Sequence, residues 1–372
     1  MSIPVFMAAV QLLGHGGYEQ LHYNESVRAS TPGPGEVLIR VKAAGINNTD
    51  INTRIGWYSA SKSQSTSDAI VSDEKITDGD WTGKGLAFPR IQGADVCGEI
   101  VGVGDGVARD RLGERVIVQS CLLSRRQGRF TPWLGSEYDG GFAQYVCAPA
   151  ADTYRVRCDL SDAQLAAIPC AYGTAENLLG RAGLGNGEVV LITGASGNVG
   201  LAACQLARLR GAQVIAIVAP EKFTAIEAAG AHRCLARDMP LMPSLKADSI
   251  DVIIDVVGGP HWPELLDVIA PGAIRRFRRH RRTDRRDGPA QVYLKDLSLF
   301  GCTAQHPDVF GRLVCYLEAG QLKPLVAREY RLEEIVAAQE EFLSKKHVGK
   351  IVLIPPGLNQ NRETQHFREA GS

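Results

Sequence analysis

The chain has no excess of charge of either sign, and this absence limits its partners. Its 372 residues include 41 lysines and arginines and 41 aspartates and glutamates, so the formal net charge is zero at pH 7. Nucleic acids and anionic membrane surfaces are usually bound through an excess of positive charge. The composition therefore predicts neither a nucleic acid nor a membrane as a partner.

Closely paired cysteines, an export signal and membrane-length apolar runs are also missing. The nine cysteines are spread without a Cys-x-x-Cys pair, and no basic N-terminal segment precedes an apolar one. The longest apolar runs fall short of the roughly 20 residues that cross a bilayer. These absences predict a soluble protein of the reducing cytoplasm. Because a single core usually stops growing near roughly 250 to 300 residues, two domains are expected.

The clearest binding signal lies in 188–211 (EVVLITGASGNVGLAACQLARLRG). Val189–Thr193 is typical of a buried parallel strand, and a helical pattern begins at Asn198. The turn between them is Gly194-Ala195-Ser196-Gly197-Asn198-Val199-Gly200. Gly197 lets a pyrophosphate approach the backbone, Gly200 lets helix and strand pack closely, and the helix N-terminus attracts negative charge. The segment predicts a dinucleotide site; a glycine turn that binds nothing is the alternative.

The remaining pattern predicts strands and helices around this segment. Strands at Val189–Thr193, Gln213–Val218 and Asp251–Val257 alternate with helical stretches, which indicates a parallel sheet covered on both faces. Further strands are expected at Val5–Leu12, Glu36–Ala43, Leu297–Gly301 and Gly349–Ile354, and helices at Val309–Ala319 and Leu332–Ser344.

Several motifs, in order and spacing, resemble the medium-chain dehydrogenase/reductase superfamily. They are GINNTD at 45–50, RIGWY at 54–58, IQGADVCGEIV at 91–101, GERV at 113–116, GGFAQY at 140–145, the glycine turn, and GKIVL at 349–353. The resemblance implies an α/β fold with a GroES-like, partly open β-barrel domain made from both chain ends (1–150 and 319–372). A Rossmann domain with a doubly wound parallel sheet (151–318) would be inserted between them, with a cleft where the domains meet. By analogy, a homodimer is expected through an edge strand of the cofactor domain.

The resemblance also bears on zinc. Zinc-using members present a cysteine where this chain has Asn47, and a His-Glu pair near 92–94, where this chain has Gln-Gly-Ala. Cys170 matches another ligand position, but one thiolate cannot make the three-ligand open site of a catalytic zinc. The structural zinc lobe needs four closely spaced cysteines, and 121–139 contains one. No metal is therefore predicted.

Without a metal ion, alcohol oxidation lacks a group that stabilises an alkoxide, whereas a quinone or an enone delocalises an incoming charge itself. The match at Asn47, Asp50 and Tyr58 is to the zinc-independent quinone oxidoreductase branch, which implies that this loop lines the substrate side of the cleft. Asn47 and Tyr58 are expected to donate hydrogen bonds to the acceptor oxygen, with Tyr58 or water supplying the proton. As structural alternatives, Asn47 holds the turn and Asp50 caps the helix that follows.

The end of the second strand favours NADPH over NADH. A carboxylate normally holds the free ribose 2′-hydroxyl roughly 20 residues after the turn, but Val218-Ala219-Pro220 offers none. Lys222 follows, where NADP-using relatives carry a lysine for the 2′-phosphate, although Glu221 is adjacent. Arg237 is a further candidate, on the adenine face. By resemblance, the predicted cofactor contacts also include Thr174, Val257 and Lys350.

One stretch departs from the family pattern. Residues 275–286 contain eight arginines, where relatives carry an apolar strand and a glycine-rich turn. One unpaired buried charge costs several kcal/mol, so this stretch is not expected to line a buried strand. The explanations are a solvated basic loop open to an anionic partner, a substitution that damages the cofactor pocket, or a reading-frame slip in the recorded gene. The slip is favoured because both flanks match the family pattern.

Together, the residues and the resemblance predict an NADPH-dependent oxidoreductase that transfers hydride to a quinone, an enone or another activated carbonyl compound without zinc. An alcohol/aldehyde dehydrogenase of the same superfamily is one alternative, and a catalytically impaired NADPH-binding protein is another. The polar segments 59–87 and 121–139 are expected to be loops that shape the choice of small-molecule acceptor.

Overall fold

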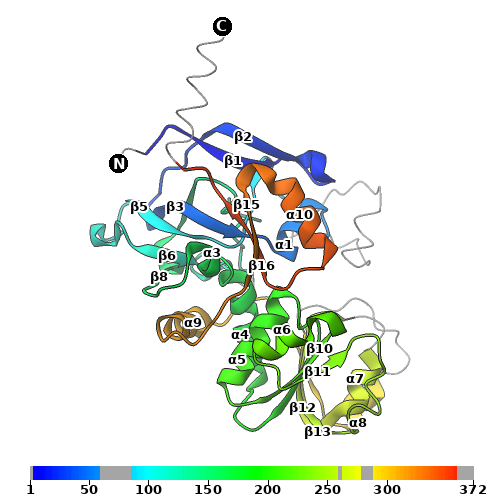
Figure 1. Cartoon of the computed structure of the whole chain (residues 1–372). Helices are drawn as coiled ribbons and strands as arrows, with labels where there is room; N and C mark the ends of the chain where they lie inside the picture. The colour runs from blue at the N-terminus through cyan, green and yellow to red at the C-terminus, as the bar shows by residue number, and fades with distance from the viewer. Residues whose placement is uncertain (1–2, 59–84, 129, 259–261, 278–287, 358–372) are drawn as a thin grey trace.

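The computed structural model describes residues 3–58, 85–128, 130–258, 262–277 and 288–357. Within these residues the strands form three sheets. Two of them make up the upper part of Figure 1, and the third, with its covering helices, makes up the lower part. No helix of the described residues is long and apolar enough to span a membrane. Most of the predicted loop at 59–87 falls outside the described residues.

The first part of the chain and its last strands share one seven-stranded sheet. Its order is β15-β16-β3-β5-β6-β8, with β7 paired to β3. The strands are β3 (Glu36–Gly45), β5 (Cys97–Val103), β6 (Arg115–Val118), β7 (Tyr145–Pro149), β8 (Thr153–Arg155), β15 (Val326–Arg331) and β16 (Lys350–Ile354). In the antiparallel pair β3–β16, Gly45 lies opposite Val352. The return segment therefore completes a sheet that the first segment begins. A smaller sheet, β2-β1-β4, joins β1 (Phe6–Leu12), β2 (Leu21–Arg28) and β4 (Arg90–Ile91).

The third sheet is parallel and six-stranded, in the order β11-β10-β9-β12-β13-β14. Its strands are β9 (Val189–Ile192), β10 (Gln213–Val218), β11 (Arg233–Ala236), β12 (Ile250–Asp255), β13 (Ile269–Phe277) and β14 (Ser298–Gly301). Along β9, Val190 and Ile192 face one core and Leu191 faces another. Both faces are therefore buried, as the continuous apolar run predicts. The chain winds in both directions from β9, which is the predicted doubly wound order.

Helices cover both faces of this sheet. One core contains residues of α4 (Pro169–Ala182), α5 (Asn198–Leu209), α6 (Phe223–Ala228) and α9 (Asp308–Glu318), and the opposite core contains residues of α7 (Trp262–Val268). The other helices are α1 (Asn48–Arg54), α3 (Asp162–Leu165), α8 (Gly288–Leu294) and α10 (Ile335–Ser344). Short 3-10 turns are η1 (Tyr18–Gln20), η2 (Arg109–Arg111), η3 (Leu123–Arg125), η4 (Ala150–Asp152), η5 (Pro220–Lys222) and η6 (Leu332–Glu334).

The expectation that the arginine stretch excludes a strand is wrong for its first two arginines. Arg275 pairs with Ile253 of β12 and Leu299 of β14, and Arg276 takes the next position in both ladders. A parallel ladder is made by backbone groups, and Ile269, at the start of the strand, is buried in the core. Backbone hydrogen bonding to β12 and β14 therefore keeps β13 in the sheet although it carries Arg275 and Arg276. The other six arginines lie in 278–287, outside the described residues, and the reading-frame slip stays a hypothesis.

Most predicted elements are found within a few residues of their expected bounds. β10 spans the predicted residues, β12 ends two residues earlier than predicted, and the predicted helix at Leu332–Ser344 is divided into η6 and α10. β8 lies just beyond residue 150, where the first domain boundary is predicted. The boundaries at 150 and 318 stay predictions.

Candidate active site and cofactor site

Asn47 precedes α1 and belongs to a buried polar cluster with Asp95 and Lys350. Its Nδ2 donates to Asp95 Oδ2 at 2.8 Å and to Gly45 O at 3.3 Å. Its Oδ1 accepts a hydrogen bond from Lys350 Nζ at 2.6 Å. The side-chain amide is thus engaged with protein groups on both sides. This geometry favours the alternative in which Asn47 holds the turn, and hydrogen bonding to an acceptor stays a prediction.

Lys350 lies inside the protein beside the same carboxylate. Its Nζ is 2.5 Å from Asp95 Oδ2, and the two side chains are 1% and 0% exposed. Asp95 Oδ1 also accepts from Cys170 N at 2.6 Å. The pair therefore joins β16, the segment before β5 and the start of α4. This position favours a structural role for Lys350, and the cofactor contact expected from the resemblance stays a prediction.

Asp50 occupies the third position of α1 and is completely buried. One carboxylate oxygen accepts from Asn47 N at 2.7 Å and the other from Gly93 N at 3.2 Å. Burial raises the pKa of Asp50 to about 7, the Asp95 charge adds to the rise, and the hydrogen bonds from Asn47 and Gly93 oppose it. The carboxylate caps the helix start and ties it to the neighbouring loop, as the structural alternative expects.

Tyr58 follows α1 and is half-buried. Its Oη donates to Thr49 Oγ1 at 2.8 Å, and its ring meets Trp57 edge-on at 5.6 Å between centroids. Ile55, Trp57 and Tyr58 form a small apolar cluster of their own. Of the three predicted catalytic residues, only Tyr58 combines partial exposure with an ionisable hydroxyl.

The glycine turn is closely packed at Gly194 and Gly200 and open at Gly197. Gly194 has a φ of +60°, and a Cβ on Gly200 would lie 2.4 Å from Gly194 O. Neither position accepts a larger residue without distortion. Gly197 is exposed and forms the N-cap of α5 without a side-chain cap hydrogen bond. The N–H groups at the start of α5 therefore form a candidate anion site, whose predicted members are Gly194, Ala195, Ser196, Gly197, Asn198, Val199 and Gly200.

The end of β12 lies beside the same turn. Asp255 is buried, and its Oδ1 accepts from Thr193 Oγ1 at 2.6 Å and from the backbone N–H groups of Val257 and Gly258 at 3.1 and 3.0 Å. Asp255 thus fixes the adjacent ends of β9 and β12. Val257, a predicted cofactor contact, is 68% exposed, and a Cβ on Gly194 would lie 2.7 Å from its Cγ2. The structure therefore brings Val257 to the turn.

Basic side chains gather after β10. Lys222 Nζ donates to the carbonyl oxygens of Lys345 at 2.6 Å and His347 at 3.2 Å. Burial lowers the pKa of Lys222; the negative charge of Glu221 opposes this shift, and the positive charge of Arg237 adds to it. Loss of hydration and the Lys222 charge lower the pKa of Lys345 to about 8. Lys222 and Arg237 are predicted from the sequence, whereas Lys345, 123 residues from Lys222, is not.

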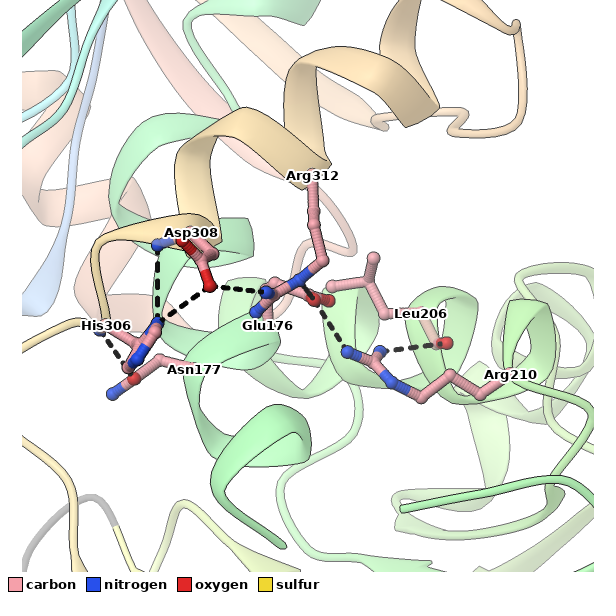
Figure 2. A network of polar contacts seen from close by, with 7 residues as sticks. All are labelled: Glu176, Asn177, Leu206, Arg210, His306, Asp308 and Arg312. Atoms are coloured by element: carbon pink, nitrogen blue, oxygen red, sulfur yellow. Dashed lines mark hydrogen bonds and ion pairs between the residues drawn. The ribbon is translucent and has the colours of Figure 1, made fainter. Parts of the chain in front are cut away.

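Helix α4 holds Thr174 and is anchored by the buried Glu176. Thr174 is 6% exposed. Glu176 Oε1 accepts from Arg210 Nη2, just after α5, and from Arg312 Nε of α9, each at 2.7 Å (Figure 2). Asn177 accepts from His306 N at 3.1 Å. These contacts hold three helices and the turn after β14 together.

Comparisons with known proteins identify the family. An alcohol dehydrogenase GroES-like domain matches residues 33–157, and a zinc-binding dehydrogenase domain matches residues 238–353. The acryloyl-coenzyme A reductase of Metallosphaera sedula is 31% identical, covering 93% of this chain and 99% of its own. The chain belongs to the medium-chain dehydrogenase/reductase superfamily.

Other members of the superfamily agree with this placement. The human quinone oxidoreductase is 28% identical over 94% of this chain and 98% of its own. The crystal structure of a putative alcohol dehydrogenase from Sinorhizobium meliloti 1021 has a TM-score of 0.83 and 39% identity, covering 95% of this chain and 98% of that one. The predicted α/β fold, with a GroES-like part and a Rossmann-like parallel sheet, is confirmed.

Membership makes the protein an oxidoreductase with a nicotinamide cofactor. The residues present fit the dinucleotide: the turn offers open backbone at Gly197, and cations lie after β10. They do not fit a catalytic zinc ion. Where zinc-using members have a cysteine thiolate, this chain has the amide of Asn47, with the Lys350 ammonium beside it. In the region where those members have a His-Glu pair, position 94 is an apolar alanine. Among the described residues no three His, Cys, Asp or Glu side chains form a group that could hold a metal.

Proposed function

We propose that the protein is an NADPH-dependent reductase of quinones, enones or other activated carbonyl compounds, acting without zinc. The observation that carries this proposal is the buried ammonium of Lys350, 2.6 Å from Asn47 Oδ1 and 2.5 Å from Asp95 Oδ2. A fixed positive charge beside the position of a metal ligand repels Zn²⁺ and neutralises the adjacent carboxylate. This arrangement supports a reaction that proceeds without a Lewis acid.

The proposed acceptor is one that needs no metal to carry negative charge. The cofactor, when bound, supplies hydride. An electron-poor carbon accepts it, and conjugation to a carbonyl group spreads the resulting charge onto oxygen. Tyr58 is the proposed proton donor, directly or through water. Its hydroxyl donates to Thr49 Oγ1 in this structure, so it has to rotate toward the acceptor, and the Thr49 hydroxyl can then donate to the Tyr58 oxygen. Two relatives have names that specify such acceptors, an acryloyl thioester and a quinone.

The preference for NADPH is supported by the cations after β10. Arg237 lies close enough to Lys222, and Lys222 to Lys345, for the first charge of each pair to lower the pKa of the second, while Glu221 partly offsets the effect on Lys222. The 2′-phosphate of NADPH would relieve this repulsion, while the uncharged 2′-hydroxyl of NADH would not. Replacing Lys222 with methionine should weaken NADPH binding by about 10-fold or more, the effect of one charge-assisted hydrogen bond, and leave NADH binding nearly unchanged.

A metal-controlled activity screen tests the proposal. The purified protein, with its metal content measured, is assayed for oxidation of NADPH and NADH with 1,4-benzoquinone, methyl vinyl ketone and benzaldehyde, each with and without EDTA. We expect EDTA-resistant turnover of the quinone or the enone, faster with NADPH. Stoichiometric zinc that is necessary for turnover would overturn the proposal.

The name of the Sinorhizobium structure favours a second candidate, an alcohol/aldehyde dehydrogenase. Alcohol oxidation that appears only on addition of zinc would support it. A third candidate is a protein that binds NADPH with impaired turnover. It is favoured because Arg275 and Arg276 lie in β13, between β12 and β14 of the cofactor sheet, where relatives carry an apolar strand. Tight NADPH binding without oxidation by any acceptor in the screen would support that candidate.

A further inference from the structure

Lys345 follows α10 at a point where the return segment touches both the cofactor domain and α1. Its carbonyl oxygen accepts from Lys222 Nζ at 2.6 Å, and its own ammonium donates to Asn48 Oδ1 at 3.3 Å. Asn48 is the first residue of α1. Two consecutive contacts therefore lead from the end of β10 to the start of the helix that carries Asp50.

The backbone and the ring of Phe342 hold Lys345 in this position. Lys345 has a φ of +56°, the left-handed conformation that ends a helix. Its Nζ lies 3.7 Å from the centroid of the Phe342 ring, a favourable cation–π distance. Phe342 is 4% exposed and packs in the core of the β-barrel part. The ammonium therefore has a defined place beside Asn48, although the residue itself is exposed.

Charge links the two ends of this connection. Lys222 and Lys345 repel each other, which helps to lower the pKa of Lys345. A phosphate dianion near Lys222 would offset this repulsion and would therefore favour the position of the Lys345 ammonium beside Asn48. The start of α1 is then held more firmly when a phosphate is present.

We propose that Lys345 is a positioning residue that couples a phosphate bound at Lys222 to α1 and the turn leading to Tyr58. This inference rests on the proposed use of NADPH. NADP⁺ would order α1 more than NAD⁺ does, although the two dinucleotides differ only at the ribose 2′ position. Because coupling between sites is reciprocal, an acceptor that binds to the ordered loop would also raise the affinity for NADPH.

Hydrogen–deuterium exchange of the full-length protein tests the coupling without any need for activity. Exchange in peptides covering 46–58 is measured alone, with saturating NADP⁺ and with saturating NAD⁺. We expect NADP⁺ to slow exchange about 5-fold more than NAD⁺ does, the lower end of typical coupling between sites. Lys345→Met and Asn48→Ala should each abolish the difference, and Lys345→Arg should retain it. Lys346→Met, at the adjacent exposed lysine, is the matched control and should behave as wild type.

The outcomes separate this inference from the proposed function. Equal slowing by both dinucleotides, when NADP⁺ has the lower dissociation constant, overturns the coupling and leaves the proposed cofactor in place. Equal dissociation constants overturn the NADPH preference and this inference with it. A difference that survives in both Lys345→Met and Asn48→Ala, or that is lost in Lys346→Met, overturns the assignment to Lys345. Melting temperatures of all variants show that each is folded.

Discussion

At the scale of single residues, Asp95 and Lys350 form a buried ion pair beside Asn47. Both charges are removed from water, and each has the other as its main compensation. A buried pair of this kind contributes little net stability, yet breaking it is costly because one charge is left alone. The pair therefore fixes where Asn47 and the start of α4 lie, whatever its net contribution to folding.

Lys350→Met should strongly destabilise the protein. The variant leaves the Asp95 carboxylate buried without its cation, so we expect the free energy of unfolding to fall by roughly 3–5 kcal/mol. Urea denaturation measures this change. The double variant Asp95→Asn/Lys350→Met removes both charges and should recover part of the loss. A loss below about 1 kcal/mol in the single variant, as for a surface pair, would contradict the buried geometry.

Asp50→Asn should change how stability depends on pH. Burial raises the pKa of Asp50 from 3.8 to about 7, so the folded protein holds this proton more tightly than the unfolded chain does. The resulting stabilisation is complete below the unfolded pKa and is lost as the pH rises to about 7, by up to ~1.4 kcal/mol per pH unit. The wild-type free energy of unfolding, minus that of Asp50→Asn, should therefore fall across this interval. A difference that stays constant with pH would argue against the raised pKa.

The sequence predicted the local roles of residues, such as capping a helix, better than it predicted which distant residues they contact. Asn47 and Asp50 in GINNTD indicate a helix start, and Asp50 does bind the backbone N–H of Asn47. The approach of Lys350 to Asn47, 303 residues away in sequence, depends on the pairing of β3 with β16. The same limit applies to Lys222, because its bonds to the Lys345 and His347 carbonyls arise only when the return segment packs beside the cofactor domain. Sequence patterns give the spacing of residues along the chain, so they do not predict contacts between residues that are far apart in the sequence.

At the scale of elements, the β9–α5 turn depends on close packing at one glycine. Gly200→Ala places a Cβ 2.4 Å from Gly194 O and 2.7 Å from Ala195 Cα, and both are backbone atoms that cannot rotate away. We expect roughly 1–3 kcal/mol of destabilisation, as for overpacking, together with weaker binding of both dinucleotides. Thermal unfolding and fluorescence titration measure the two effects.

Gly197→Ala is the matched control for the same turn. The nearest atom to its added Cβ is Gly194 O, at 3.3 Å, and Gly197 has an ordinary φ of −76°. This variant should therefore unfold close to the wild-type temperature but bind dinucleotides less tightly, because the methyl group stands where a pyrophosphate would approach. Equal destabilisation by the two variants would show that close packing at Gly200 is not the special feature of this turn.

Elements with continuous or periodic patterns were predicted well, whereas β13 and β15, which both carry charged residues, were not. β9 and β10 are apolar on both faces, so the pattern indicates a buried strand without further information. The arginines of β13 interrupt such an apolar run, so the sequence pattern does not predict this strand. It is identified by its position between β12 and β14 in the sheet. Backbone pairing with two neighbours decided the conformation there, where side-chain pattern predicted the opposite.

At the scale of the whole molecule, we expect two copies to pair through β14, the last strand of the six-stranded sheet in the part of the chain that the structure describes. Leu299 of β14 is 40% exposed, and Tyr293 and Leu294 of α8, which precedes β14 in the chain, are 83% and 76% exposed. An exposed edge strand with apolar neighbours favours pairing, and a two-fold axis makes such pairing self-limiting.

Light scattering should give twice the 40.1 kDa of one chain. Leu299→Lys should shift the mass toward one chain, whereas Leu209→Lys on α5, 39% exposed, should leave the dimer intact. A monomeric wild type, or equal effects of the two lysines, would exclude pairing through β14.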